Sequence, residues 1–398
     1  MSAVTKGIFI VGAKRTAFGT FGGAFKNTSS TILQTAACKA ALQAANCNPE
    51  LVDSVNIGNV IPASSPDGGY LPRHVSLHSG VPIDRPALGL NRLCGSGFQA
   101  VVSGALDIMS GSAQISLTGG VDNMSQAPFI VRNTRFGTTL GGSYNFEDSL
   151  WTALTDSYCK LPMALTAENL AVKYNINRET VDKFALRSQQ NWKKGQDEGA
   201  FKAEIVPFKL KVKGKEVEFS VDEHPKPQTT MESLGKLSPV FKKDGVVTAG
   251  SASGICDGAA AVLLASESAS SKHNLKPLAR VVAYSTVGVP PEIMGFGPVP
   301  AIQNVLKVAN LTLDDIDLIE INEAFGVQAL ACAQALNIDF NKFNVNGGAI
   351  ALGHPLAASG SRITGHLVHE LRRKNLKRAI GSACIGGGQG IAVLIEAV

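Results

Sequence analysis

The chain has 398 residues, of which 44% are hydrophobic and 17% are charged, and its formal net charge is +5. This length predicts two or three domain-sized units, and the composition excludes an intrinsically disordered chain. No apolar run reaches the roughly 18–20 residues that cross a bilayer, so we expect no membrane span.

Residues 1–122 alternate between short apolar runs and longer Ala/Leu-rich runs. The apolar runs predict strands and the periodic runs predict helices, an alternation that is typical of layered α/β folds. We expect strands at 7–13, 52–60, 87–92 and 115–118, and helices at 31–45 and 98–110.

The pattern changes between residues 123 and 243, where strands become sparse and helices are expected at 167–172 and 178–195. This predicts a domain inserted into the α/β body. Strand-like runs return at 246–251 and 259–264, so we assign 244–275 to the first half.

The excess positive charge lies between residues 183 and 243, which hold 13 Lys and Arg against 8 Asp and Glu. A basic segment suits an anionic small ligand or nucleic acid, and a solvated lysine-rich surface explains it equally well.

Residues 276–398 form a second α/β half that repeats the first. The run at 316–323 resembles that at 52–59 in its apolar pattern and in the position of its aspartate, Asp317 or Asp53. Cys94 follows Asp53 by 41 residues and His354 follows Asp317 by 37. The repeat predicts that Cys94 and His354 occupy equivalent turns, which a pseudo-two-fold axis brings together.

The seven cysteines form no CxxC pair and no metal-ligand spacing. An odd count argues against a disulfide framework, so we expect a reducing compartment, no metal site, and nucleophilic or acid/base chemistry for any special cysteine.

The first acidic residue is Glu50, and acid-poor, basic N-termini are typical of mitochondrial import signals. We expect the mitochondrial matrix, with the cytoplasm as the alternative.

Cys94 and His354 each lie on a glycine-rich turn before a predicted helix. The positive end of a helix dipole favours thiolate over thiol, which predicts a nucleophile at Cys94. The alternatives are a buried inert cysteine and a structural histidine, because both are common.

Two further candidates, Cys384 and Asn322, fall at predicted strand ends. We expect Cys384 to be an exposed thiol suited to proton transfer, with free N–H groups in the glycines after it. The Asn322 amide can hold a water or a carbonyl oxygen, although asparagine is more often a turn residue. Taken together, these residues predict nucleophilic acyl chemistry.

Five motifs resemble those of the thiolase family, and the resemblance covers essentially the whole chain. They are Asn91-Arg-Leu-Cys-Gly-Ser-Gly, Gly119-Gly-Val-Asp-Asn-Met-Ser, Asn322-Glu-Ala-Phe, Asn344-Val-Asn-Gly-Gly-Ala-Ile-Ala-Leu-Gly-His-Pro and Cys384-Ile-Gly-Gly-Gly-Gln-Gly. The segments around Leu161, Gln228 and Phe241 look most like the mitochondrial branch that degrades 3-ketoacyl-CoA.

The resemblance implies a five-layered α-β-α-β-α fold of two pseudo-repeated halves plus an inserted loop domain. It also implies a homotetramer, a dimer of dimers. By position, Cys94 is the nucleophile, His354 activates it, and Cys384 is the general acid/base. A water on Asn322, with His354, forms one oxyanion hole, and the N–H groups of Cys94 and Gly386 form another.

The implied reaction is thiolytic cleavage of 3-ketoacyl-CoA by coenzyme A, as in fatty acid β-oxidation, with acyl-CoA hydrolysis as a side activity. Coenzyme A is a co-substrate, no cofactor is tightly bound, and no nucleic acid partner is expected. Family contacts to coenzyme A map onto Lys226, Thr229 and Ser253, and Lys226 stands where many relatives have arginine.

Two other functions stay open. A biosynthetic acetoacetyl-CoA thiolase would use the same chemistry in reverse. A non-catalytic lipid- or RNA-binding protein would leave the turns at Cys94, His354 and Cys384 without a purpose.

Overall fold

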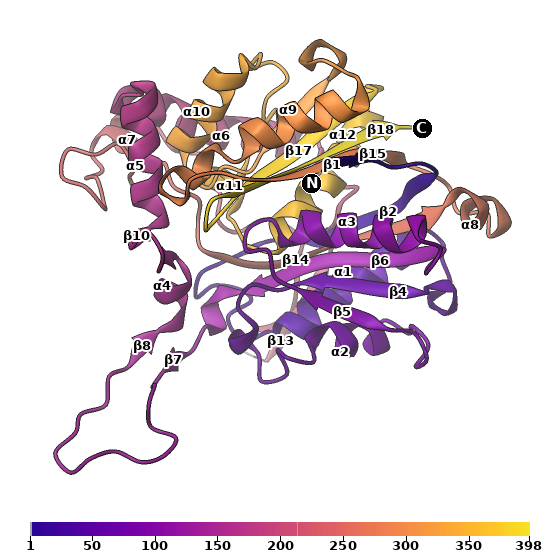
Figure 1. Cartoon of the computed structure of the whole chain (residues 1–398), viewed down its shortest axis with the longest axis horizontal. Coiled ribbons are helices and arrows are strands. Elements are labelled where there is room, and N and C mark those ends of the chain that lie inside the picture. Colours follow the sequence, from indigo (N-terminus) through magenta and orange to yellow (C-terminus); the bar gives the residue numbers. More distant parts are fainter. Residues whose placement is uncertain (1, 213) are drawn as a thin grey trace.

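The first half of the chain is built on a five-stranded portion of a large mixed sheet, ordered β2-β14-β6-β4-β5. The computed structural model describes residues 2–212 and 214–398 (Figure 1). The strands are β2 (Ile8–Thr16), β4 (Ser54–Gly58), β5 (Ala87–Leu90), β6 (Ile115–Asn123) and β14 (Cys256–Ser266). Strands β4, β5 and β6 run parallel, so their carboxyl ends meet at one edge.

The second half repeats this order as β15-β18-β17-β16, and the two halves join where β2 pairs with β15. Its strands are β15 (Ala279–Gly288), β16 (Leu318–Ile321), β17 (Arg378–Ile385) and β18 (Gln389–Ala397). Short strands add to the sheet: β1 (Ser2–Val4) on β15, β3 (Gly19–Thr20) on β14, and β11 (Ile205–Val206) on β2.

Two aspartates confirm the internal repeat. The Asp53 carboxylate before β4 accepts hydrogen bonds from the N–H groups of Gln114 and Ile115 at the start of β6. The Asp317 carboxylate before β16 likewise accepts from the two N–H groups of residues 377 and 378, where β17 begins. Equivalent aspartates therefore set the register of equivalent strand pairs in the two halves.

The helices and sheet portions stack in the expected five layers. Helices α1 (Ser30–Ala44) and α2 (Leu71–His78) cover the outer face of the first half, and α9 (Pro298–Ala309) and α10 (Gly326–Leu336) cover that of the second (Figure 1). Helices α3 (Ser96–Met109) and α12 (Ala358–Lys374) lie between the two. One buried apolar core surrounds the central helices, and another lies under the outer helices of each half.

The two central helices touch through glycines. A Cβ on Gly97 would overlap the carbonyl of Ala357, and a Cβ on Gly360 would overlap the N–H of Phe98. Glycine at both positions lets the N-terminal turns of α3 and α12 approach closely. The turns that precede these helices carry Cys94 and His354, so the predicted juxtaposition of the two halves is confirmed.

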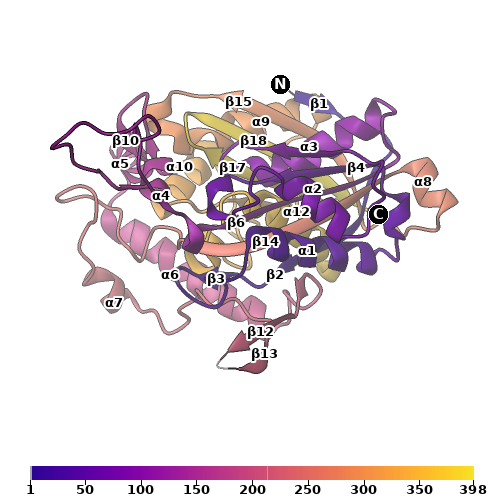
Figure 2. The same ribbon diagram turned by 90° about the horizontal axis from the view of Figure 1, so that it is seen from below.

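The segment between β6 and β14 holds mainly helices and short hairpins. They are β7 (Phe129–Ile130), β8 (Glu147–Asp148), α4 (Ser149–Ala153), β9 (Thr155–Asp156), β10 (Leu161–Pro162), α5 (Met163–Tyr174), α6 (Arg178–Asp197), β12 (Phe208–Val212), β13 (Lys215–Phe219) and α7 (Met231–Gly235). The loop between β7 and β8 extends away from the body of the molecule (Figure 1). The β12–β13 hairpin lies at the periphery of that body (Figure 2).

One predicted strand is wrong, because residues 246–251 form turns. The N–H groups of Val246 and Val247 donate to the buried carboxylate of Glu168 on α5, in place of a neighbouring strand. Strand β6 is longer than predicted, since it runs through Gly119 and Gly120. These glycines serve close packing, because a Cβ on Gly120 would overlap the carbonyl of Ala357.

Two short helices complete the fold, α8 (Glu267–Lys272) after β14 and α11 (Ala349–Leu352) before His354. Within residues 2–212 and 214–398, we find no helix with the length and apolarity needed to cross a membrane.

Candidate active site

Cys94 lies on a tight turn between β5 and α3. Leu93 has a φ of 46°, a left-handed conformation that side chains rarely adopt and that marks a strained turn. Neighbouring side chains stabilise it, because Asn91 accepts from the Leu93 N–H at 2.9 Å and the Ser96 hydroxyl donates to the Leu93 carbonyl at 2.7 Å. The turn packs on β17, where a Cβ on Gly95 would overlap Ile385.

His354 occupies the equivalent turn before α12 and is buried. Gly353 has a φ of 93°, and a Cβ there would overlap the Cys256 sulfur, so glycine is required on both counts. The His354 Nδ1 lies 2.6 Å from the hydroxyl oxygen of Ser359, in the first turn of α12. Ser359 therefore fixes the orientation of the imidazole ring.

Asn322 follows β16 and faces the same ring, with its Nδ2 3.3 Å from His354 Nε2. Asn344 supports this strand end through hydrogen bonds to both backbone groups of Ile321. The Asn322 Oδ1 is buried and has no hydrogen-bond partner among the described residues. An unpartnered buried amide oxygen is suited to holding a water or a substrate group.

Cys384 lies near the end of β17, two residues before Gly386. The expectation of an exposed thiol is wrong, because Cys384 is fully buried beneath Met294 and Ala324. The N–H of Gly386 donates to the Cys94 sulfur, and the nearness of Cys94 adds to the effect of burial in raising the pKa of Cys384. The structure thus brings Cys94, Cys384 and Gly386 together at one site.

The electrostatics of this site favour neutral groups. Burial raises the pKa of Cys94 to about 11, against the opposing hydrogen bond from Gly386, and burial also raises the pKa of Cys384. Burial lowers the pKa of His354 to about 3, helped by the Arg362 charge. Burial therefore opposes the thiolate that the helix dipole is predicted to favour at Cys94, and it keeps His354 neutral.

A pocket of about 420 Å³ leads to His354 and is lined mainly by apolar side chains from the inserted segment. Those from the inserted segment include Leu150, Trp151, Leu154, Met163 and Phe241, and the second half adds Phe325. Trp151 stacks on Phe241 with ring centroids 6.1 Å apart. Such a pocket accommodates a long, flexible ligand with an apolar portion.

The three residues mapped to coenzyme A lie in two places. Ser253 lines the pocket beside His354. Lys226 and Thr229 lie on the loop before α7, where Lys226 is exposed and the Thr229 hydroxyl donates to the Lys226 carbonyl at 2.7 Å. They do not line this pocket.

Sequence reasoning assigned no role to Ser359 or to the apolar wall of the pocket. Ser359 carried a detectable signal, since it lies in the first turn of the helix that follows His354. The aromatic wall carried none, because Trp151 and Phe241 come from distant segments without periodicity.

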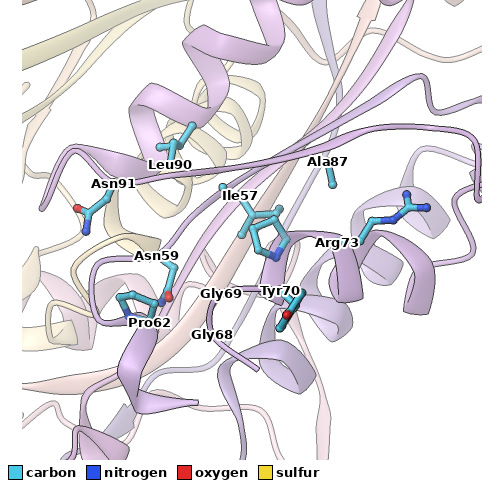
Figure 3. Close-up of a pocket in the computed structure, with 12 residues that line it drawn as sticks. Ile57, Asn59, Pro62, Gly68, Gly69, Tyr70, Arg73, Ala87, Leu90 and Asn91 are labelled. Carbon is cyan, nitrogen blue, oxygen red and sulfur yellow. The ribbon is translucent and has the colours of Figure 1, made fainter. Parts of the chain in front are cut away.

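A second depression of about 360 Å³ lies along the edge strand β5 (Figure 3). Ile57, Tyr70, Arg73 and Leu90 line it, together with Asn91, which supports the back of the Cys94 turn. It contains none of the predicted catalytic residues.

A duplicated five-layered body with two cysteines, a histidine and an asparagine converging at its centre is the arrangement of a thiolase. The chain matches the family models for the thiolase N-terminal domain over residues 8–268 and the thiolase C-terminal domain over residues 275–397. The chain belongs to the thiolase family.

Among its relatives, the chain is 58% identical to human mitochondrial 3-ketoacyl-CoA thiolase over 394 residues, which cover 99% of each chain. It is 42% identical over 389 residues to an acetyl-CoA acetyltransferase of Rhizobium meliloti, covering 98% of each. The crystal structure of the human enzyme superposes with a TM-score of 0.97 over 99% of each chain. A structure of that enzyme in complex with CoA gives the same score, over 100% of this chain and 99% of that one.

Proposed function

We propose that this protein is an acyltransferase that cleaves 3-ketoacyl-CoA with coenzyme A, giving acetyl-CoA and an acyl-CoA shortened by two carbons. The observation that carries the proposal is that Cys94, Cys384 and Gly386 meet at one site, where Cys94 packs against the turn after His354, whose ring lines an apolar pocket. The 58% identity to a 3-ketoacyl-CoA thiolase over almost the whole chain supports the same substrate class.

In the first half-reaction His354 accepts the proton of Cys94, and the sulfur attacks the 3-keto carbon. The resulting oxyanion is stabilised by the N–H groups of Cys94 and Gly386, and the enolate oxygen that forms next is stabilised by His354 and a water on Asn322. When the carbonyl re-forms, the C2–C3 bond breaks and its electron pair passes to the acetyl-CoA enolate. Cys384 gives this enolate its proton.

In the second half-reaction Cys384 takes the thiol proton of an incoming coenzyme A, which attacks the thioester on Cys94. The N–H groups of Cys94 and Gly386 stabilise this oxyanion. The tetrahedral intermediate collapses to the shortened acyl-CoA, and Cys94 regains its proton from His354. Losing one preorganised donor of this kind typically costs about 10²–10³ in rate.

The neutral state of His354 supports its assignment as the base. A histidine whose pKa is lowered to about 3 is unprotonated at neutral pH and free to accept the Cys94 proton. We assign the Nδ1–H tautomer, in which Nδ1 donates to the Ser359 hydroxyl oxygen and Nε2 is the proton acceptor.

Coenzyme A is the co-substrate, and we assign no tightly bound cofactor. Residues 123–243 form the loop domain that contributes to coenzyme A binding and to assembly, between the catalytic halves 1–122 with 244–275 and 276–398. The apolar pocket holds the pantetheine arm against Ser253, while Lys226 and Thr229 contact the nucleotide end. The basic excess of the loop domain attracts the phosphates.

The molecule assembles as a homotetramer in the mitochondrial matrix. Strand β5 pairs with β4 and with no other strand that the structure describes, and Leu88 on it is 54% exposed. A second copy covers this edge, because open apolar strand edges promote pairing. The β7–β8 loop, with Phe136 and Leu140 fully exposed, joins two dimers. A monomer in sedimentation equilibrium would contradict this assembly.

The experiment that tests the function is a thiolysis assay across 3-ketoacyl-CoA chain lengths, with products separated by chromatography. We expect equal amounts of acetyl-CoA and shortened acyl-CoA, no products with Cys94→Ala, and slow release of free acid when coenzyme A is omitted. Activity confined to acetoacetyl-CoA would favour a biosynthetic acetyltransferase. Activity undiminished by Cys94→Ala would overturn the mechanism.

A further inference from the structure

Asp122 is a fully buried carboxylate at the end of β6 that the reaction does not use. Its oxygens accept hydrogen bonds from the Asn59 amide and from the backbone N–H groups of Val60, Ile61 and Ala357, at 2.8–3.0 Å. Among the described residues no Lys or Arg pairs with it within 4.0 Å. A buried carboxylate without a cation is costly, so its position calls for a purpose.

The donors to Asp122 come from both halves of the molecule. Val60 and Ile61 follow β4 in the first half, whereas Ala357 lies three residues after His354 in the second. The backbone of Ala357 is contacted on its other side as well, since its carbonyl lies where a Cβ on Gly120 would be. Asp122 and Gly120 on one strand thus fix the backbone of one residue of the opposite half on both sides.

Ala357 leads directly into the helical turn that orients the His354 imidazole. Ala357 begins the first turn of α12, and this turn carries Ser359, whose hydroxyl lies 2.6 Å from His354 Nδ1. A carboxylate that accepts from an N–H group at a helix N-terminus also stabilises the helix start. The position of the His354 ring therefore depends on Asp122 through one turn of α12.

Cys94 packs against the same cluster, which includes Val60, Ile61 and Ala357. We propose that Asp122 is a positioning residue for the thiolase reaction. Its carboxylate binds the turn after His354 in one half and the backbone of Val60 and Ile61, which pack against Cys94, in the other. The inference rests on the proposed function and specifies how the two halves of that site keep their register.

The charge of Asp122 supports a positional role over activation of the nucleophile. Burial is the main cause of the raised pKa of Cys94, and the nearby Asp122 charge adds to it. Asp122 therefore makes the thiolate less favourable, an effect opposite to that of an activating group. Burial also raises the pKa of Asp122 itself, to about 7.

The test compares Asp122→Asn with the wild type in two assays. The amide keeps the size of the side chain but turns one acceptor into a donor that faces N–H groups. We expect kcat for thiolysis to fall by about 10²-fold, because small misplacements of reacting groups cost this much, while KM changes by less than about threefold. The rate of Cys94 alkylation by iodoacetamide at pH 8.5 should rise by about threefold, because a negative charge is removed.

The matched control is Asp107→Asn, in the same half. Asp107 accepts from the side chains of Ser54 and Asn56 and lies away from the catalytic turns, so kcat and alkylation should stay at wild-type values. Slower turnover combined with a more reactive thiol separates positioning from general loss of structure. The alkylation assay needs no substrate, so it still reports on Asp122 if the proposed reaction is wrong.

Three results would overturn the proposal. One is a kcat for Asp122→Asn within twofold of wild type. Another is a loss of kcat that Asp107→Asn reproduces. The third is failure of both Asp122→Asn and Asp122→Ser to give folded protein, since Asp122 would then serve the fold and not the position of His354.

Discussion

Single residues decide the chemistry of this site, and burial is the property that controls them. Burial favours a thiol at Cys94, which is half-buried, and a neutral imidazole at His354, which is buried. The free protein therefore holds no thiolate–imidazolium pair. In the proposed reaction, proton transfer to His354 accompanies attack on the substrate.

This electrostatic state predicts how Cys94 reacts with iodoacetamide as the pH changes. Only the thiolate reacts, and with a pKa near 11 its fraction grows about tenfold per pH unit between pH 7 and 10. His354 stays neutral over this range, so we expect no inflection near pH 6.5. The rate is measured by mass spectrometry of the Cys94 peptide. A plateau below pH 8 would mean that the thiolate forms in the free protein.

At the same scale, sequence patterns predicted which residues would lie at the candidate site but not their surroundings. Cys94, His354 and Asn322 could be predicted because glycine-rich turns and strand ends leave a visible pattern. The burial of Cys384 could not, because it depends on Met294 and Ala324, which other segments bring over the strand end. The position of Ser359 in the first turn of a helix is visible in the sequence, but its contact with His354 depends on the geometry of the turn.

Elements bring these residues together, and the crossing of α3 and α12 is the decisive contact. Their N-terminal turns touch through Gly97 and Gly360, so the distance between the Cys94 and His354 turns depends on the absence of side chains there. The strands and central helices could be predicted from periodicity and from the repeat. The turns at 246–251 could not, because Glu168 supplies the hydrogen-bond partner from a distant helix.

Substituting Gly360 by alanine should separate these turns. The new Cβ would overlap the backbone of Phe98, and such overpacking costs about 1–3 kcal/mol in the free energy of unfolding. We expect kcat to fall together with stability, measured by urea unfolding and thiolysis. Gly365→Ala, on the same helix, is the control, because its Cβ meets only Ala13 at 3.3 Å. Equal effects of the two substitutions would contradict this role of the crossing.

The whole molecule is held together by a buried charge network that joins three segments. Arg15 on β2 binds Glu204 at 2.7 Å and Asp222 at 2.6 Å, both from the inserted segment. His366 on α12, in the second half, contacts the other Glu204 oxygen at 2.7 Å. Sequence could not predict this network, since its members lie far apart and no local pattern marks them.

Replacing Glu204 by glutamine should weaken the whole fold. Removing one partner of a buried pair leaves the others uncompensated, so we expect a loss of about 3 kcal/mol in the free energy of unfolding at pH 7. Although burial opposes it, the charges of His366 and Arg15 lower the pKa of Glu204 to about 2. The carboxylate thus stabilises the fold above its ordinary pKa of 4.5, and this contribution is lost as the pH falls toward 2.

Denaturant unfolding at pH 7 and pH 3 measures both parts of this prediction. Glu198→Gln is the control, because Glu198 is largely exposed and its contact with Arg373 is long, at 3.5 Å. Its substitution should change stability by less than about 0.5 kcal/mol. If Glu204→Gln changed the free energy of unfolding as little as the control does, the network would not hold the segments together.

The central claim is that Cys94 carries the acyl group between the two half-reactions. Mass spectrometry of the protein after incubation with a 3-ketoacyl-CoA, without free coenzyme A, tests it most directly. We predict that the Cys94 peptide gains the mass of an acyl group two carbons shorter than that of the substrate, and that adding coenzyme A removes it. An unmodified Cys94, or the same adduct on Cys384, would contradict the account.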